Sequence, residues 1–200
     1  VAFVDRTAGT DYLRATDASP CALVRVQGKE HAATAATLAG GRLTLRFGNT
    51  GVTAIIKTES RTSGITFSVE SVTSGEKNYV ALSPLHPPLP AKIGEEGGWE
   101  GGEGEIDSLT FLNVPLTLKG VPAEPFGACA LSLNLFTRVD ALPALQRDLR
   151  ASCEKKFGLI GAKVAIVGAP MARMLPALQK TLAAASELSA ERLDQCLVVG

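Results

Sequence analysis

The sequence predicts an α+β fold in which an antiparallel β-sandwich over residues 1–140 is followed by a small βαβ segment over residues 141–200. In the first part, short runs rich in Val, Ile, Leu, Phe and Thr recur at roughly ten-residue spacing, with glycine-containing turns between them. Within these runs apolar and polar residues alternate, as in half-buried strands. After residue 141 the apolar spacing lengthens to four residues and then becomes a continuous apolar run.

Composition and charge narrow the classes of partner. The 200 residues are 46% hydrophobic and 20% charged, which suits a folded domain with a core. Twenty Lys and Arg balance 20 Asp and Glu, so no polybasic surface is expected for nucleic acid or for an anionic membrane. The most apolar stretch, residues 159–170, contains Lys163 and is shorter than the ~20 residues that cross a bilayer. We therefore expect neither a nucleic-acid nor a membrane partner.

The sandwich is expected to contain strands at residues 1–5, 21–27, 42–47, 52–57, 64–72, 107–113, 116–119 and 129–139. The alternation is clearest where Leu43 and Leu45 share a face opposite Thr44. The stretch 30–38, which contains His31, is expected to be a strand or a sheet edge made of polar and small residues. Together these strands predict two antiparallel sheets packed against each other.

Two stretches interrupt this pattern. Residues 83–90 hold four prolines around His86, so we expect a surface crossing without ladder hydrogen bonds. Residues 94–104 hold six glycines and four glutamates around Trp99, and this composition predicts a flexible acidic loop. Its glutamates lack the ligand pattern of a calcium loop, so no metal is expected there. An exposed indole among glycines can stack on a sugar or an aromatic ligand, which makes Trp99 the candidate ligand-binding residue. The alternative is that this indole pins the loop onto the sandwich.

The last 60 residues show a different periodicity. Apolar residues recur every four positions from Leu145 to Phe157 and predict a helix that ends at Gly158. Residues 161–168 then predict a strand buried on both faces, as in parallel sheets. A second helix over 171–188 and a strand over 196–199 complete the expected βαβ unit. We expect this unit to begin a larger or truncated domain, and to self-associate through its uncovered apolar face.

No residue receives a catalytic assignment from its motif. The four cysteines, Cys21, Cys129, Cys153 and Cys196, show no metal-ligand spacing, so no metal is expected, and no cofactor is expected either. We expect free thiols, and a single disulfide is the alternative that the sequence leaves open. Residues 164–170 lead into a helix, as at the phosphate-binding turn of dinucleotide folds. The later glycine positions of that fingerprint are Pro170 and Arg173, which obstruct a close backbone approach. Because the fingerprint matches only in part, nucleotide binding is kept as the third functional hypothesis, behind the two given next.

The first hypothesis comes from a resemblance. Residues 131–143, the helix ending Lys156-Phe157-Gly158 and residues 161–170 together resemble a junction found in large bacterial carbohydrate-active enzymes. There an N-terminal β-sandwich precedes a catalytic (β/α)8 barrel, the TIM barrel, and residue 161 would begin its first strand. The resemblance implies glycoside hydrolase or polysaccharide lyase chemistry in a longer parent, a secreted or periplasmic location, and catalytic residues beyond this chain.

On that hypothesis the chain is the non-catalytic N-terminal region of such an enzyme, its sandwich supports the catalytic barrel, and the isolated chain is inactive. The alternative is a free-standing β-sandwich that binds a glycan or a protein through its loops, Trp99 included. A polysaccharide or oligosaccharide is the expected partner in the first reading.

Overall fold

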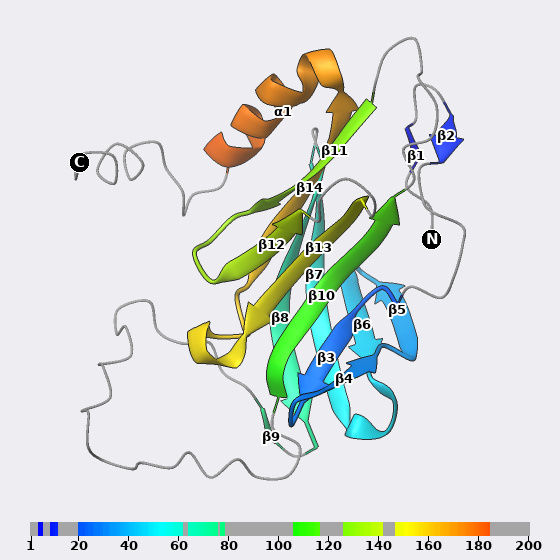
Figure 1. Cartoon of the computed structure of the whole chain (residues 1–200), viewed down its shortest axis with the longest axis vertical. Helices are drawn as coiled ribbons and strands as arrows, with labels where there is room; N and C mark the ends of the chain where they lie inside the picture. The colour runs from blue at the N-terminus through cyan, green and yellow to red at the C-terminus, as the bar shows by residue number, and fades with distance from the viewer. Residues whose placement is uncertain are drawn as a thin grey trace, which may run out of the picture.

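The computed structural model describes residues 4–5, 9–11, 20–61, 64–75, 77–78, 106–116, 126–141 and 147–184. Two antiparallel sheets lie face to face with the main core between them, and one helix covers part of the outside (Figure 1). A short separate ladder joins β1 (Val4–Asp5) to β2 (Thr10–Asp11). The predicted antiparallel β-sandwich is confirmed.

The smaller sheet has five strands. Their order is β12 (Thr137–Ala141), β13 (Arg147–Glu154), β10 (Ile106–Leu116), β3 (Leu23–Val26) and β4 (Lys29–Ala32). The larger sheet has the order β11 (Phe126–Ser132), β14 (Lys163–Pro170), β8 (Gly64–Ser74), β7 (Val52–Arg61), β6 (Arg42–Arg46) and β5 (Ala35–Ala39). The short β9 (Lys77–Asn78) pairs with the end of β8. Two 3-10 turns, η1 (Gly48–Thr50) and η2 (Lys155–Phe157), complete the described elements besides the helix.

The alternation seen in the sequence sets which side chains enter the core. Leu45 and Phe47 are buried, whereas Arg46 between them is exposed. On β7 the alternate residues Val52, Ala54 and Ile56 are buried in the same cluster. The stretch 30–38, expected to be a strand or a sheet edge, supplies most of β4 and β5, which are edge strands of the two sheets. His31 lies on β4.

The predicted helix ending at Gly158 is wrong, because most of that segment is strand β13. This strand pairs with β10 on one side and β12 on the other. A four-residue spacing suits one helix face, but it is also twice the strand period. Leu149 and Cys153 therefore share a face in either structure, and in β13 the buried Ala151 lies between them on that face. Pairing on both edges overrides the helix-forming composition of the segment.

The expected long strand over residues 129–139 is also wrong. The chain leaves the larger sheet after Ser132, turns through residues 133–136 and enters the smaller sheet as β12. This turn is the crossover that joins the two sheets at one side. The polar side chain of this turn, Asn134, is hydrogen-bonded to the Thr137 hydroxyl and to the Gly161 carbonyl oxygen.

The expected buried strand at 161–168 is confirmed as β14, which is buried on both faces. Its predicted parallel pairing is wrong, because β14 is antiparallel to both β8 and β11. The strands that follow residue 140, β13 and β14, belong to the two sheets of the sandwich, and the structure does not confirm the start of a barrel. Residues 196–199 lie outside the described residues, and their expected pairing and self-association stay predictions.

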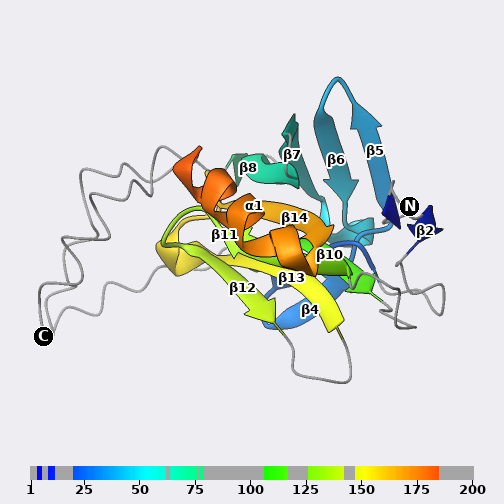
Figure 2. The same cartoon turned by 90° about the horizontal axis from the view of Figure 1, so that it is seen from above.

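The second predicted helix is present as α1 (Met171–Ala183), while residues 185–188 lie outside the described part of the chain. Pro176 is its sixth residue, past the first turn, and is exposed there. Seen from above, α1 lies over β14 and β11 at one end of the larger sheet, and β5 lies at the opposite end (Figure 2). Much of the outer face of the larger sheet is therefore not covered by this helix.

Candidate functional site

The described residues among those singled out from the sequence do not form one site. Trp99 and His86 lie outside the described residues, so the proposed sugar contact of Trp99 stays a prediction. Gly168 and Pro170 end β14, and Arg173 is exposed on α1. The dinucleotide arrangement requires a parallel sheet at this turn, and the strand leading into α1 is antiparallel to both of its neighbours.

The three described cysteines are separate thiols, and Cys196 lies outside the described residues. Cys21 is exposed, Cys129 is half-buried and Cys153 is buried, and all three are free. Burial raises the pKa of the Cys153 thiol to about 12. Desolvation also raises the pKa of Cys129. Because the thiolate is the reactive form, these two cysteines are poor nucleophiles in the folded protein.

A row of three basic residues and one serine crosses the outer face of the larger sheet. Arg42 on β6 lies opposite Lys57 on β7, Lys57 lies opposite Ser68 on β8, and Ser68 lies opposite Lys163 on β14. The strand register thus brings four residues that are far apart in the sequence into one line. Each lies on the outer face because its neighbours along the strand point into the core.

Arg42 and Lys57 are like charges in directly opposed positions, an arrangement that destabilises a sheet unless acids compensate it. One of the compensating acids is Glu70. The Arg42 guanidinium donates two hydrogen bonds to its carboxylate, from Nε at 2.6 Å and from Nη2 at 2.8 Å. These bonds lower the pKa of Glu70 and raise that of Arg42. Glu70 reaches this position at an irregularity in the β7–β8 register, where Ile55 pairs with Ser71 and Ile56 with Val69.

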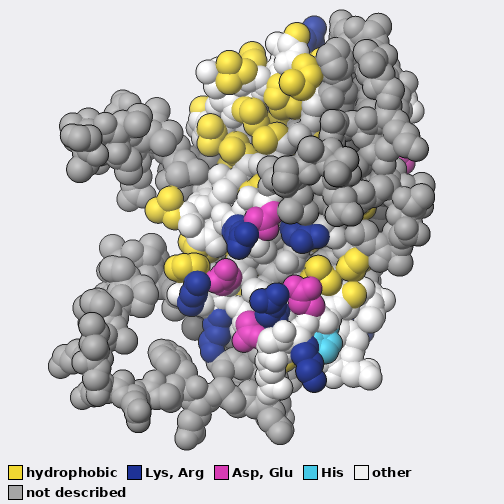
Figure 3. Space-filling view, viewed as in Figure 1, with side chains coloured by type: hydrophobic (Ala, Val, Ile, Leu, Met, Phe, Trp, Pro, Cys, Tyr) yellow, Lys and Arg dark blue, Asp and Glu magenta, His cyan; other side chains and the backbone are white. Residues whose placement is uncertain are grey.

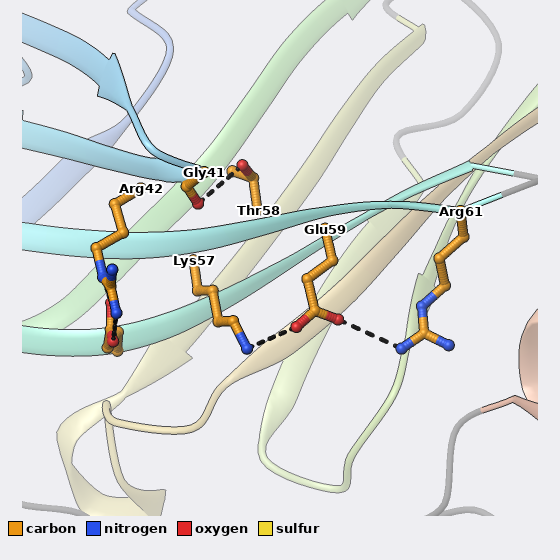
Figure 4. A network of polar contacts seen from close by, with 7 residues as sticks. Gly41, Arg42, Lys57, Thr58, Glu59 and Arg61 are labelled. Carbon is orange, nitrogen blue, oxygen red and sulfur yellow. Dashed lines mark hydrogen bonds and ion pairs between the residues drawn. The ribbon is translucent and has the colours of Figure 1, made fainter.

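The second compensating acid is Glu59, which lies between two cations (Figure 4). Its Oε1 is 2.6 Å from Lys57 Nζ, and its Oε2 accepts a hydrogen bond of 3.3 Å from Arg61 Nη2. The hydrogen bond from Lys57 is the main cause of a lowered pKa of Glu59. The carboxylate therefore stays ionised over the whole neutral range and holds both cations in place.

A small recess lies beside this row, at the C-terminal end of α1. It is lined by Arg61, Thr66, Leu133, Lys163, Thr181 and Ala184. Its water-accessible volume of about 10 Å³ is the size of one water molecule. Arg61 Nη1 lies 3.5 Å from the carbonyl oxygen of Ala184, so its guanidinium faces the end of the helix. A larger ligand would lie across this recess rather than inside it.

The helix is seated by apolar contacts on the outer face. Ala165 and Leu133 are buried in a second small cluster, which includes the half-buried Leu131. On β11, a Cβ at Gly127 would meet the side chains of Met171 and Met174, so glycine permits the helix to approach closely. This packing places the end of α1 next to Lys163.

A buried polar network fixes the backbone at Lys163. The Asn134 amide donates to the carbonyl oxygen of Gly161 at 2.7 Å, and its Oδ1 accepts a hydrogen bond of 2.5 Å from the Thr137 hydroxyl. The Thr137 oxygen in turn accepts the backbone N–H of Lys163 at 2.7 Å. The Ser132 hydroxyl lies within hydrogen-bond distance of the carbonyl oxygens of Asn134 and Thr137. The crossover turn is thus tied to the start of β14.

The outer face of the larger sheet carries more basic than acidic side chains. Its outward-facing cations are Arg42, Arg46, Lys57, Arg61 and Lys163, and its described acids are Glu59 and Glu70. These cations outnumber the acids, so the face has an excess of positive charge although the whole chain has no net charge. On the smaller sheet, by contrast, acidic and basic side chains are interspersed (Figure 3). The same view shows hydrophobic side chains gathered over α1.

Sequence reasoning missed this face because its residues are separated by up to 121 positions and no local motif marks them. The only local signal is the alternation of basic and apolar residues in residues 42–47. In the described part of the chain, no cluster of three or more His, Cys, Asp or Glu side chains is arranged to hold a metal ion. The described helix is also too short and too polar to span a bilayer.

The fold and this face define the class of the protein as an antiparallel β-sandwich with a basic outer sheet surface. Comparisons with protein-family models, with curated proteins and with solved structures found no significant match to the chain.

Proposed function

We propose that this chain is a β-sandwich module that binds an acidic polysaccharide on the outer face of its larger sheet, and that it serves as the non-catalytic N-terminal region of a carbohydrate-active enzyme. The observation that carries the binding role is the line of Arg42, Lys57 and Lys163 across the strands. From β6 to β14 this line covers three strand spacings, roughly 14 Å. Such a span suits an extended oligosaccharide better than a single small molecule.

The chemistry of the face supports an acidic ligand. Ammonium and guanidinium groups form their strongest hydrogen bonds with carboxylates and sulfates. The Ser68 hydroxyl lies in the same row as the cations and can bond to sugar hydroxyls. The two glutamates hold Arg42 and Lys57 in defined positions, which lowers the entropy lost on binding.

The place within a larger enzyme rests on the sequence resemblance of the junction around residues 131–170, although the structure has strand β13 in place of the helix before Gly158 and an antiparallel β14 in place of a parallel barrel strand. A sandwich fold hosts many functions, so the fold alone does not select this one. The parent reading frame tests it: several hundred further residues with repeated strand and helix alternation are expected after this segment. A parent without a catalytic domain would leave the alternative, a free-standing glycan-binding or protein-binding module.

The binding role is tested with polygalacturonate as an acidic probe and dextran as a neutral one, by isothermal titration calorimetry with the full chain. We expect binding to polygalacturonate that weakens with added salt, and none to dextran. The double variant Lys57→Gln/Lys163→Gln should bind about tenfold more weakly or worse, because a hydrogen bond to a charged group contributes about 1.5 kcal/mol or more.

The matched control is Arg138→Gln/Lys156→Gln, which removes two exposed cations from the other side of the sandwich. It should bind like the wild type. Equal binding of both double variants, or equal binding of the two polysaccharides, would contradict the proposal. Loss of binding only in Trp99→Ala would place the ligand on the acidic loop instead.

A further inference from the structure

β5 (Ala35–Ala39) is an open edge of the larger sheet. Among the described strands it pairs only with β6, and all five of its residues are exposed. Leu38, a large apolar side chain, is 65% exposed. On an edge strand, alternate backbone N–H and C=O groups point away from the sheet and can pair with another strand.

The other edge strands of the two large sheets, β4, β12 and β11, have features that hinder the addition of another strand, and β5 has none. β4 carries charged Lys29 and Glu30, and β12 carries Arg138 paired with Asp140. β11 is half-buried along most of its length and contacts α1 and β12. β5 has the sequence Ala-Ala-Thr-Leu-Ala, without a charge, a proline or a register irregularity. Natural sheets use those devices to prevent strand addition, so their absence from this exposed strand favours pairing.

We propose that β5 pairs with β5 of a second copy of this chain, antiparallel and about a two-fold axis at Thr37, so that the two larger sheets become continuous. Thr37 of one copy then lies opposite Thr37 of the other, Ala36 opposite Leu38, and Ala35 opposite Ala39. This inference does not depend on the proposed polysaccharide ligand.

The faces of the strand agree with this pairing. Ala36 and Leu38 lie opposite Leu45 and Leu43 of β6, so both point to the core side of the sheet. In the paired sheets each Leu38 would meet Ala36 of the other copy on that same side, and its exposed surface would be covered. Thr37 lies on the outer side, where cross-strand Thr–Thr pairs are favourable. Small alanines elsewhere in the strand allow the two backbones to approach.

The charges near β5 also fit a second copy. The nearest ones on the outer face are Arg42 and Arg46 of β6, opposite Ala39 and Ala35. Across the joint, Arg42 of one copy and Arg46 of the other would be three strand spacings apart, roughly 14 Å. That distance exceeds the Debye length of about 8 Å at physiological salt, so repulsion is weak. β5 carries no charge, so it offers no ion pair to a charged peptide. A second copy of β5 is equally uncharged and suits it better.

The joint involves five residues of each chain, so we expect a weak, concentration-dependent dimer at the small end of protein interfaces. Its consequence is geometric. The basic outer faces of the two larger sheets would lie side by side on one continuous surface, and a polymeric ligand could contact both at once.

The test is sedimentation velocity of the full chain over a wide range of protein concentrations. The wild type is expected to shift from monomer toward dimer as the concentration rises. Thr37→Lys and Thr37→Glu each place like charges directly opposite each other at the two-fold axis, and each should stay monomeric. An equal mixture of the two variants places opposite charges there and should restore the dimer.

Ala32→Lys is the matched control, because it adds the same charge to an exposed position on β4 at the edge of the smaller sheet. It should dimerise like the wild type. Circular dichroism and urea unfolding check that each variant keeps the fold. A wild type that stays monomeric at every concentration, a Thr37→Lys variant that dimerises, or a mixture that does not would each overturn the proposal.

Discussion

Asn134 is the residue whose removal should most directly loosen the join between the two sheets. It is 8% exposed, and its side chain makes hydrogen bonds to the Gly161 carbonyl and the Thr137 hydroxyl. In Asn134→Ala both bonds are lost, at about 1 kcal/mol each, and a buried polar group left without its partner adds about 1–3 kcal/mol. We expect the free energy of unfolding to fall by about 3–5 kcal/mol in total.

Urea unfolding measures this change. With a urea dependence of about 1–3 kcal/mol per molar for a protein of this size, the midpoint should fall by about 1 M or more while the slope stays constant. Leu135→Ala is the control, because Leu135 is the next residue of the same turn and is 97% exposed. It should change stability by less than about 0.5 kcal/mol.

If these hydrogen bonds form one network, the losses of unfolding free energy caused by changing Asn134 and Thr137 must be coupled. Thr137 accepts the backbone N–H of Lys163, so Thr137→Val breaks the same chain of bonds one step further along. The double variant should lose less than the sum of the single losses, by at least about 0.5 kcal/mol. Additive losses, or an Asn134→Ala variant as stable as Leu135→Ala, would refute the reasoning.

Three further predictions concern other parts of the sandwich. Gly64→Ala should lower stability by about 1–3 kcal/mol in urea unfolding, because the added Cβ would meet the backbone oxygen of Ile166 on the neighbouring strand; a neutral result would contradict this close contact. A thiol reagent at neutral pH should label exposed Cys21 quickly and Cys153 only on unfolding, since burial raises its pKa to about 12, and mass spectrometry of the labelled peptides checks the order. The pKa of Glu70 is lower in the folded than in the unfolded chain, so its small contribution to stability is present above the ordinary glutamate pKa of about 4.3 and is lost as the pH falls through the folded pKa. Urea midpoints measured between neutral and acidic pH should therefore fall less steeply in Glu70→Gln, and an unchanged pH profile would count against the ion pair with Arg42.

Local alternation was enough to predict the β-sandwich. In residues 42–47 and 52–57 the period of two decides which side chains are buried, and the structure buries the alternate set that includes Leu45 and Ile56. The polar and small residues 30–38 indicated a strand or a sheet edge, and in the structure they supply most of two edge strands, β4 and β5. These features depend only on neighbours along the chain, so they can be found before the tertiary structure is known.

Residues after 140 show the limit of that reasoning. The spacing of Leu149 and Cys153 fits a helix and a strand equally well, and only the presence of β10 and β12 on either side decides for the strand. The apolar run of β14 reads as parallel because it is buried on both faces, yet that burial comes from the opposite sheet on one side and α1 on the other. In both cases contacts with other elements of the fold, and not the local sequence pattern, decide the structure.

The candidate site depends on the tertiary structure to a still greater degree. Arg42, Lys57 and Lys163 become neighbours only when β6, β7, β8 and β14 pair in one particular register, and a shift of one residue in that register would move a basic side chain to the other face. Each residue alone is an ordinary solvated charge in a chain whose charges balance. Composition and periodicity therefore predict a neutral sandwich, while strand order and register create a basic face on it.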